Sequence, residues 1–176
     1  VGFGRIGREV GKRALAFGMQ LHVYDPYVDE QQVGAAGAVY VKDLDTFLPK
    51  TDFLSLHLPY TPKNHHIIGH EELRALPSSA YVINTARGGL IDEDELFKAL
   101  ESGNLAGAGL DCFEQEPPSK NLKLLTSGKV IVSPHNASLT AECTRRLGLV
   151  CVENVVDALT GCLKKERVVN WDAVHA

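Results

Sequence analysis

The sequence predicts an α/β fold built on a doubly wound parallel sheet, and three observations lead to that prediction. Short β-rich runs alternate with helical patterns along the 176 residues, which is typical of successive βαβ units. These runs are apolar along their length, as buried parallel strands are. The chain also opens with VGFGRIG, a glycine spacing that ends a strand and starts a helix in dinucleotide-binding proteins.

The strands expected from this pattern are Leu21–Tyr24, Phe53–Leu58, Tyr81–Asn84, Ala106–Leu110 and Val130–Val132. The helices expected between and after them lie near Ile6–Phe17, Leu44–Leu48, Glu71–Leu76, Glu93–Glu101 and Thr140–Gly161. Asp92 and Glu95 resemble a capping box at one helix start, and Gly103 stands where that helix should end. In the tail, Val168–Val169 is expected to be strand-like.

The composition excludes several classes of function. A formal net charge of -4 offers no basic field for a nucleic acid backbone. No apolar run approaches the roughly 18 residues that a membrane span needs. The four cysteines form no CxxC pair, which favours reduced thiols and a cytoplasmic protein. The neighbouring histidines are expected to be solvated loop residues rather than metal ligands, so no metal is predicted; they are His65, His66 and His70.

The glycine loop and one acidic residue predict the cofactor. Gly2 permits a tight turn, Gly4 lets the backbone approach a pyrophosphate, and Gly7 allows close helix–strand packing. Asp25 follows the strand LHVY at the spacing of an acid that binds the adenosine ribose. Its carboxylate would repel a 2′-phosphate, and no arginine follows in DPYVDEQQ, so NAD is favoured over NADP. The alternative for Asp25 is a turn-forming role ahead of Pro26.

Three polar residues follow the carboxyl ends of expected strands, where open α/β sheets place their ligands. Arg87 would hold a substrate carboxylate, and His135 would exchange a proton with a keto or hydroxyl oxygen. Glu116, beside it, would favour the imidazolium. Such a set suits hydride transfer at a carbon bearing oxygen. Each residue has an alternative role as well: a solvated turn for Arg87, a surface position for Glu116, and a helix cap or core hydrogen bond for His135.

Five segments, VGFGRIGREV, HLPYTP, VINTARGGLIDEDEL, AGAGLDCFEQEPP and SPHNAS, resemble the successive signatures of the D-isomer-specific 2-hydroxyacid dehydrogenase family. The similarity extends from Val1 to about Asn170 and is greatest for the phosphoglycerate dehydrogenase and hydroxypyruvate/glyoxylate reductase branches. It implies a Rossmann-type NAD-binding domain with Arg87, Glu116 and His135 as catalytic residues. With the glycine loop, the expected cofactor-binding residues are Gly2, Gly4, Arg5, Ile6, Gly7, Asp25, Leu58, Pro59, Thr85, Ala86, Arg87, Asp111, His135, Ala137 and Ser138.

The resemblance implies an oxidoreductase that transfers a hydride between NAD(H) and a small 2-hydroxy or 2-keto acid, working as a homodimer. Two alternatives stay open. One is an NAD-sensing, protein-binding module similar to the C-terminal-binding co-repressors, and the other is a phosphite dehydrogenase-like oxidoreductase. The sequence departs from the family at Cys112, where valine is more usual, and Asn136 occupies a variable position.

We expect residues 1–162 to form the NAD-binding domain and residues 163–176 to lead back to a substrate domain that is absent from this chain. A first strand needs about five residues, and only Val1 precedes Gly2. The expectation is therefore a fragment of a longer protein, cut inside its first strand. Such a fragment should be inactive alone and should bind NAD weakly at best.

Overall fold

The structure, a computed structural model, describes residues 1–174 of the chain. It divides into two compact units, Val1–His135 and a second unit that begins at Asn136. The first unit holds every strand assigned among the described residues. The candidate catalytic residues all belong to the first unit.

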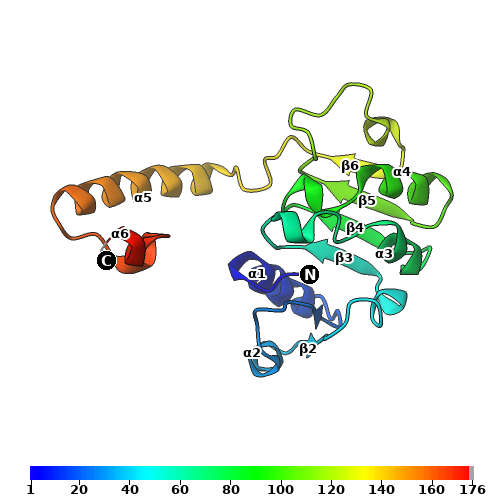
Figure 1. Ribbon diagram of the computed structural model, residues 1–176, viewed down its shortest axis with the longest axis horizontal. Coiled ribbons are helices and arrows are strands. Elements are labelled where there is room, and N and C mark those ends of the chain that lie inside the picture. The colour runs from blue at the N-terminus through cyan, green and yellow to red at the C-terminus, as the bar shows by residue number, and fades with distance from the viewer. Residues whose placement is uncertain (175–176) are drawn as a thin grey trace. The chain divides into compact units, whose positions relative to one another are not determined.

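The first unit contains six strands, which form two parallel sheets (Figure 1). β1 (His22–Val23) pairs with β2 (Val39–Tyr40). A second sheet has the order β3 (Phe53–Leu56), β4 (Tyr81–Asn84), β5 (Gly107–Leu110) and β6 (Val130–Val132). Because all of these strands are parallel, their carboxyl ends meet at one edge, where ligands bind in open α/β sheets.

Residues 1–3 connect the two sheets. The Gly2 N–H donates to the Tyr24 carbonyl at 2.9 Å. On the other side, the amino group of Val1 donates to the Ser55 carbonyl at 2.8 Å, and the His57 N–H donates to the Val1 carbonyl at 2.8 Å. The resulting order, β2, β1, residues 1–3, β3, β4, β5, β6, is that of a doubly wound dinucleotide-binding sheet. A cavity of about 90 Å³ lies beside residues 1–3, and apolar residues that line it include Val10, Leu21, Phe47 and Phe53.

Four helices belong to the first unit: α1 (Arg5–Ala16), α2 (Glu30–Ala35), α3 (His70–Ala75) and α4 (Glu93–Glu101). The start of α4 has half of the predicted capping box: the Asp92 side chain accepts a hydrogen bond from Glu95 N at 3.0 Å, whereas the Glu95 carboxylate pairs with His70 and Lys98. The end of α4 is as predicted, because Gly103 takes the left-handed conformation with φ +79°. Figure 1 shows α3 and α4 together on one side of the four-stranded sheet.

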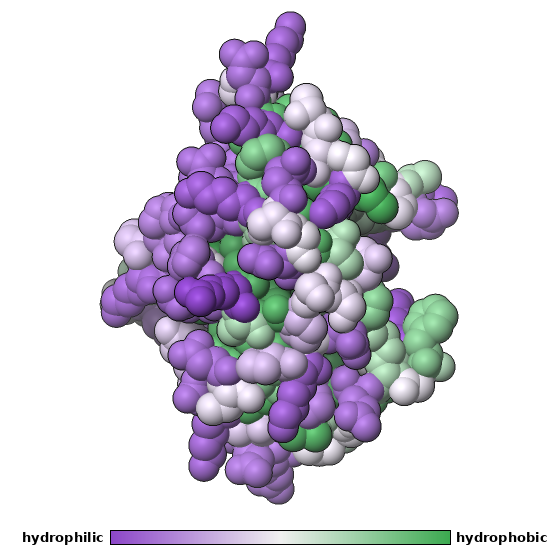
Figure 2. Space-filling view, turned by 90° about the vertical axis from the view of Figure 1, so that its right-hand side faces the viewer, coloured by the Kyte–Doolittle hydropathy of each residue, from purple (hydrophilic) through white to green (hydrophobic). Residues whose placement is uncertain are grey.

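The main core lies between this sheet and α3 and α4. Leu56 and Val82 of the sheet and Leu73, Leu96 and Leu100 of the helices are each at most 1% exposed. The surface on the α3 and α4 side is largely hydrophilic (Figure 2), which is typical of helices that bury one face. A smaller core joins α2 to β1 through Val33 and Val23.

Several predicted boundaries differ from the structure. Two short elements, α2 and β2, were not predicted, and the strand expected at Leu21–Tyr24 has only two residues. The helix expected at Leu44–Leu48 is wrong, because a 3₁₀ turn at Leu48–Lys50 takes its place. Pro49 has no N–H to donate and fits the first turn of such a short element.

The second unit contains α5 (Ala141–Leu159) and α6 (Trp171–Val174). The Thr140 side chain caps α5 by accepting from Cys143 N at 3.1 Å, as expected from the predicted helix start. The prediction of a strand at Val168–Val169 is wrong. That stretch lies between a 3₁₀ turn, Lys165–Arg167, and α6, and the Arg167 guanidinium donates to the Asn154 side chain of α5 at 2.9 Å.

Candidate active site and cofactor site

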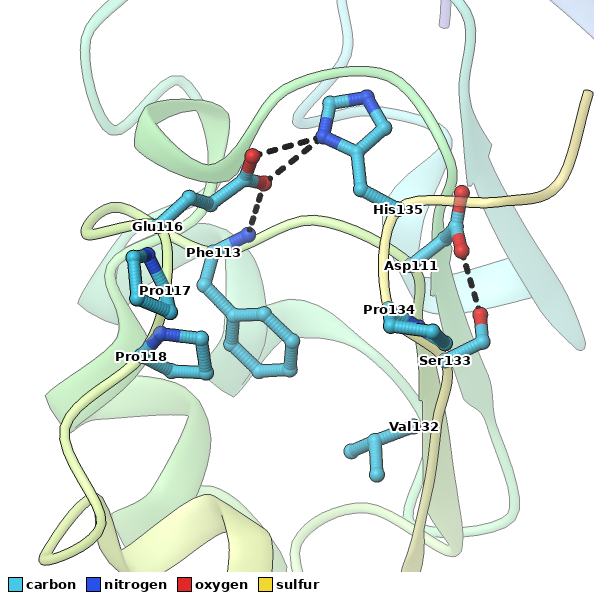
Figure 3. A pocket seen from close by; sticks show the side chains of 9 residues that line it. All are labelled: Asp111, Phe113, Glu116, Pro117, Pro118, Val132, Ser133, Pro134 and His135. Carbon is cyan, nitrogen blue, oxygen red and sulfur yellow. Dashed lines mark hydrogen bonds and ion pairs between the residues drawn. The ribbon is translucent and has the colours of Figure 1, made fainter.

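Glu116 and His135 meet at the carboxyl edge of the sheet. Glu116 lies in the loop that follows β5, and His135 lies three residues beyond β6. His135 Nδ1 is 2.7 Å from Glu116 Oε2 and 3.0 Å from Oε1 (Figure 3). Because an ionised carboxylate only accepts, the hydrogen on Nδ1 is donated. The other ring nitrogen, Nε2, points away from Glu116 and is left for another partner.

Glu116 is also held by the backbone of its own loop. The Phe113 N–H donates to Glu116 Oε1 at 3.0 Å. The hydrogen bond from His135 and then that from Phe113 lower the pKa of Glu116 below its ordinary value of 4.5, with smaller contributions from the positive charges of His135 and Arg87. Glu116 is therefore a carboxylate at neutral pH, held ready to pair with an imidazolium.

A cavity of about 320 Å³ adjoins this pair, and Figure 3 shows its lining residues. Asp111, at the end of β5, is 4% exposed. The Ser133 hydroxyl donates to Asp111 Oδ1 at 2.5 Å. This bond ties the end of β5 to the segment that carries His135, whose backbone has a positive φ of 52°. Such a conformation is uncommon outside glycine and clusters at functional sites.

The turn after β4 presents Arg87. Asn84, 1% exposed, donates from Nδ2 to the Arg87 carbonyl at 2.8 Å, and its Oδ1 accepts from the Ala86 N–H at 3.0 Å. Thr85 and the Arg87 side chain lie on the exposed outside of this turn. Asn84 is missing from the sequence-predicted site. A polar residue closing an otherwise apolar strand was the signal that could have found it.

The Arg87 turn packs directly on the Glu116 loop. A Cβ atom added to Gly88 would lie 1.9 Å from the Phe113 carbonyl carbon, so no other residue fits there. A second cavity, of about 410 Å³, opens where the two segments meet. All three candidate catalytic residues line it, together with Tyr60, His65, Gly88, Gly89, Phe113 and Glu114.

The glycine loop has the shape that a dinucleotide needs. Gly2 takes φ +86°, and a Cβ there would lie 2.7 Å from the His57 backbone. A Cβ on Gly7 would lie 2.3 Å from the Gly2 carbonyl oxygen, whereas a Cβ on Gly4 would meet nothing within 4 Å. The loop is thus closed toward the sheet and open at Gly4. Gly4 also begins α1 without a side-chain cap, which leaves first-turn N–H groups for a phosphate.

Asp25 is fixed beside this loop. Its Oδ2 accepts from the Phe3 N–H at 2.7 Å and its Oδ1 accepts from the Tyr27 N–H at 2.8 Å. The second bond is the turn-forming role ahead of Pro26. The first holds the carboxylate next to the glycine loop, and each oxygen keeps a further lone pair for a ribose hydroxyl. The two roles are compatible.

The other expected cofactor-binding residues divide between the two units. Arg5 and Ile6 stand exposed in the first turn of α1, and Leu58 and Pro59 follow β3 at the carboxyl edge. Ala137 and Ser138 belong to the second unit, ahead of α5.

Two of the three neighbouring histidines differ from the expected solvated loop residues. His70 is the first residue of α3 and its Nδ1 is 2.7 Å from Glu95 Oε2. His66 lies between two carboxylates, those of Asp92 and Glu114. Within residues 1–174, no group of three or more metal-ligating side chains is arranged to hold a metal ion.

The four cysteines are free thiols. Cys112 is buried beside Asn84, with Sγ 3.6 Å from the Asn84 carbonyl oxygen. Burial, with the negative charges of Glu116 and Asp111, raises the pKa of this thiol to about 12. It is a packing residue, as expected. Over the described part of the chain, no helix combines the length and apolarity required to span a bilayer.

The family follows from a comparison with known protein families. The model of the D-isomer specific 2-hydroxyacid dehydrogenase NAD-binding domain matches residues 1–137, which include the glycine loop and His135. The chain belongs to this family. Its cofactor is accordingly NAD, and the resemblance carried by the five sequence segments is confirmed.

Curated relatives in the family agree. The chain is 44% identical to a D-3-phosphoglycerate dehydrogenase of Methanocaldococcus jannaschii, over 97% of this chain and 32% of the relative. It is also 44% identical to a hydroxypyruvate reductase of Thermotoga maritima, over 90% of this chain and 51% of the relative. The chain therefore spans about half, or less, of the length of these relatives.

Solved structures of the family share the fold. An NAD-complexed D-isomer specific 2-hydroxyacid dehydrogenase of Lactobacillus delbrueckii ssp. bulgaricus superposes with a TM-score of 0.85 at 31% identity, covering 93% of this chain and 53% of that one. A D-lactate dehydrogenase of Aquifex aeolicus, complexed with NAD and lactic acid, gives 0.83 at 37% identity, covering 92% and 52%. The predicted fold class is confirmed.

Proposed function

We propose that this chain supplies the NAD-binding and proton-transferring half of an enzyme that moves a hydride between NAD(H) and a small 2-hydroxy or 2-keto acid. The observation that carries the proposal is the Glu116–His135 pair, with Nδ1 and Oε2 2.7 Å apart, lining one cavity with Arg87. An imidazole backed by a carboxylate, beside a guanidinium, is what reduction of a keto acid requires.

When NAD is bound, it supplies the hydride acceptor, or in its reduced form the donor. His135 gives a proton from Nε2 to the keto oxygen during reduction and takes it back during oxidation. Glu116 holds Nδ1–H, which fixes Nε2 as the exchanging nitrogen and stabilises the imidazolium. Arg87 binds the substrate carboxylate through its planar guanidinium. The N–H groups at the start of α1 bind the pyrophosphate, and Asp25 accepts from the ribose.

The proposal extends to the rest of the protein. Residues 1–162 act as the cofactor domain, and residues 163–176 lead back to a substrate domain supplied outside this chain. The relatives' greater length supports that division, since the hydroxypyruvate reductase is matched over 51% of its length. A homodimer is proposed from the family resemblance. The free thiols support a reducing, cytoplasmic location.

The test is a panel of 2-keto acids, including glyoxylate and hydroxypyruvate, offered with NADH to the full-length protein while NADH absorbance is followed. Turnover of at least one acid is expected. It should be lost in His135→Ala, and in Arg87→Lys the KM for the acid should rise, because lysine cannot form the paired contact.

The alternative classes predict different results. Tight NADH binding with no turnover of any acid would favour the co-repressor-like sensor, and oxidation of phosphite in place of hydroxy acids would favour a phosphite dehydrogenase. Asp25→Ala should reduce the preference for NAD over NADP. An unchanged preference would remove the ribose role from Asp25.

A further inference from the structure

His66 contacts both segments that carry candidate catalytic side chains. Its backbone N–H donates to the Gly89 carbonyl at 2.8 Å, two residues after Arg87. Its imidazole Nε2 lies 2.6 Å from Glu114 Oε1, two residues before Glu116. One residue therefore links the turn after β4 to the loop after β5.

The backbone of His66 is fixed in an uncommon conformation. Among residues 1–174, only His66 and His135 combine a side chain with a positive φ, and both have φ +52°. Neighbouring hydrogen bonds hold the segment in place: Ile68 N donates to the Leu90 carbonyl at 3.1 Å, and Asp92 N donates to the Ile68 carbonyl at 3.0 Å. A conformation that costs about 1–3 kcal/mol persists only where its surroundings determine it.

The imidazole lies between the carboxylates of Asp92 and Glu114, and a third carboxylate, that of Glu93, bonds the backbone of Glu114. His66 Nδ1 is 3.4 Å from Asp92 Oδ2, and Glu93 Oε1 accepts from the Glu114 N–H at 2.7 Å. Burial, together with the nearby charges of Glu114 and Asp94, raises the pKa of Glu93. The side chains of Glu93 and Glu114 therefore repel each other. The His66 imidazole donates to the Glu114 carboxylate and so holds it in place. The His65 ring stacks on the His66 ring, with 3.7 Å between the two ring centroids.

We propose that His66 is a positioning residue for the proposed reaction, setting the separation between the turn that carries Arg87 and the loop that carries Glu116. It does not line the cavity that holds these two side chains, and it acts through Glu114 and Gly89. The inference rests on the proposed function, since a positioning role needs a reaction to position for.

The first variant is His66→Asn. Asparagine tolerates the left-handed backbone but is too short to reach Glu114, so the exchange removes the side-chain link and leaves the Gly89 bond. His66→Gln restores the reach to Glu114. The matched control is His70→Asn, because His70 also pairs with a carboxylate, Glu95 at 2.7 Å, but does so between α3 and α4, away from the cavity.

Two measurements are made on the full-length protein. The first is keto acid reduction, for which kcat should fall about ten- to hundredfold in His66→Asn, the scale of a small misplacement of reacting groups, with the KM for NADH within about twofold. The second is a ¹³C NMR titration of the Glu116 carboxyl. Its pKa should rise toward the ordinary value of 4.5 as the loop loosens. His66→Gln should recover most of both losses, and His70→Asn should change neither.

The results separate the inference from the function on which it rests. A folded His66→Asn that matches His70→Asn in kcat and in the Glu116 titration would overturn the positioning role. If wild-type protein reduces no keto acid, the proposed function fails and the positioning role for its reaction fails with it, whereas the Glu116 titration still shows whether His66 holds the loop that carries Glu116.

If His66→Asn does not fold, Glu114→Ala tests the same contact from the other side, because alanine has no oxygen to accept from His66 Nε2. The link predicts that it too lowers kcat and raises the Glu116 pKa. Wild-type values in both measurements would refute the proposal.

Discussion

The buried side-chain amide of Asn84 donates a hydrogen bond to the Arg87 carbonyl at 2.8 Å. Its oxygen accepts from the Ala86 N–H at 3.0 Å, so one buried amide closes the turn on both sides. In the proposed mechanism Arg87 binds the substrate carboxylate, and Asn84 would then position the guanidinium by holding the backbone of the turn that carries it.

Replacing Asn84 with alanine should therefore affect both stability and substrate binding. Two buried hydrogen bonds are lost, which should lower the free energy of unfolding by about 2–3 kcal/mol. The KM for the keto acid should rise, and the Kd for NADH should rise with it, because the expected cofactor-binding residues Thr85 and Ala86 belong to the same turn. Urea denaturation and steady-state kinetics measure these effects. Ser102→Ala, which removes a hydrogen bond to the Ala99 carbonyl at the end of α4, is the comparison and should leave the KM as it is. An unchanged KM in Asn84→Ala would contradict the role assigned to the turn.

Glu116→Gln should change the pH dependence of activity. The pKa of Glu116 is lowered from its ordinary value of 4.5 by its hydrogen bonds with His135 and Phe113, so the wild-type carboxylate keeps its charge to lower pH than an ordinary glutamate does. Glutamine removes the negative charge beside His135, so the acid limb of the pH–rate profile of Glu116→Gln should lie at a different pH from that of wild type. Glu95→Gln removes another carboxyl of lowered pKa outside the site and should leave the profile unchanged.

The same carboxylate should make stability depend on pH. A lowered pKa in the folded state means that Glu116 stabilises the fold above its unfolded value, near 4.5, and that this contribution is lost as the pH falls through the folded value. The difference in Tm between wild type and Glu116→Gln should accordingly be present at pH 7 and shrink in acid. Thermal melts across this range measure it, and a difference that grows in acid would have the wrong sign.

Gly4 and Gly88 form a contrasting pair. A Cβ at Gly88 would lie 1.9 Å from Phe113, whereas at Gly4 it would enter open space. Gly88→Ala should cost about 3 kcal/mol or more in stability. Gly4→Ala should stay within about 1 kcal/mol of wild type and yet weaken NAD binding, because in the proposed cofactor site the added methyl group would meet the pyrophosphate. Denaturation measures the loss of stability expected for Gly88→Ala, and NADH fluorescence titration measures the loss of affinity expected for Gly4→Ala. Equal NAD affinity in Gly4→Ala would place the phosphates elsewhere.

Much of the site could be predicted from the sequence because it follows from topology. Adjacent parallel strands end at one edge, so polar residues just beyond β5 and β6 had to lie near each other, and Glu116 and His135 do. Contacts set by tertiary packing left no local pattern. The strand Val39–Tyr40 exists through pairing with His22–Val23, and nothing near His66 in the sequence points to Glu114, 48 residues away.

The contact between Gly88 and Phe113 has a consequence for how such a protein can diversify. Where two backbones touch with no side chain between them, the spacing of the chemical groups they carry is a fixed dimension of the scaffold. In the proposed reaction, this contact sets the distance between the turn that carries Arg87 and the loop that carries Glu116. Exchanges at other lining residues of the cavity, such as Tyr60 and His65, would leave that distance as it is.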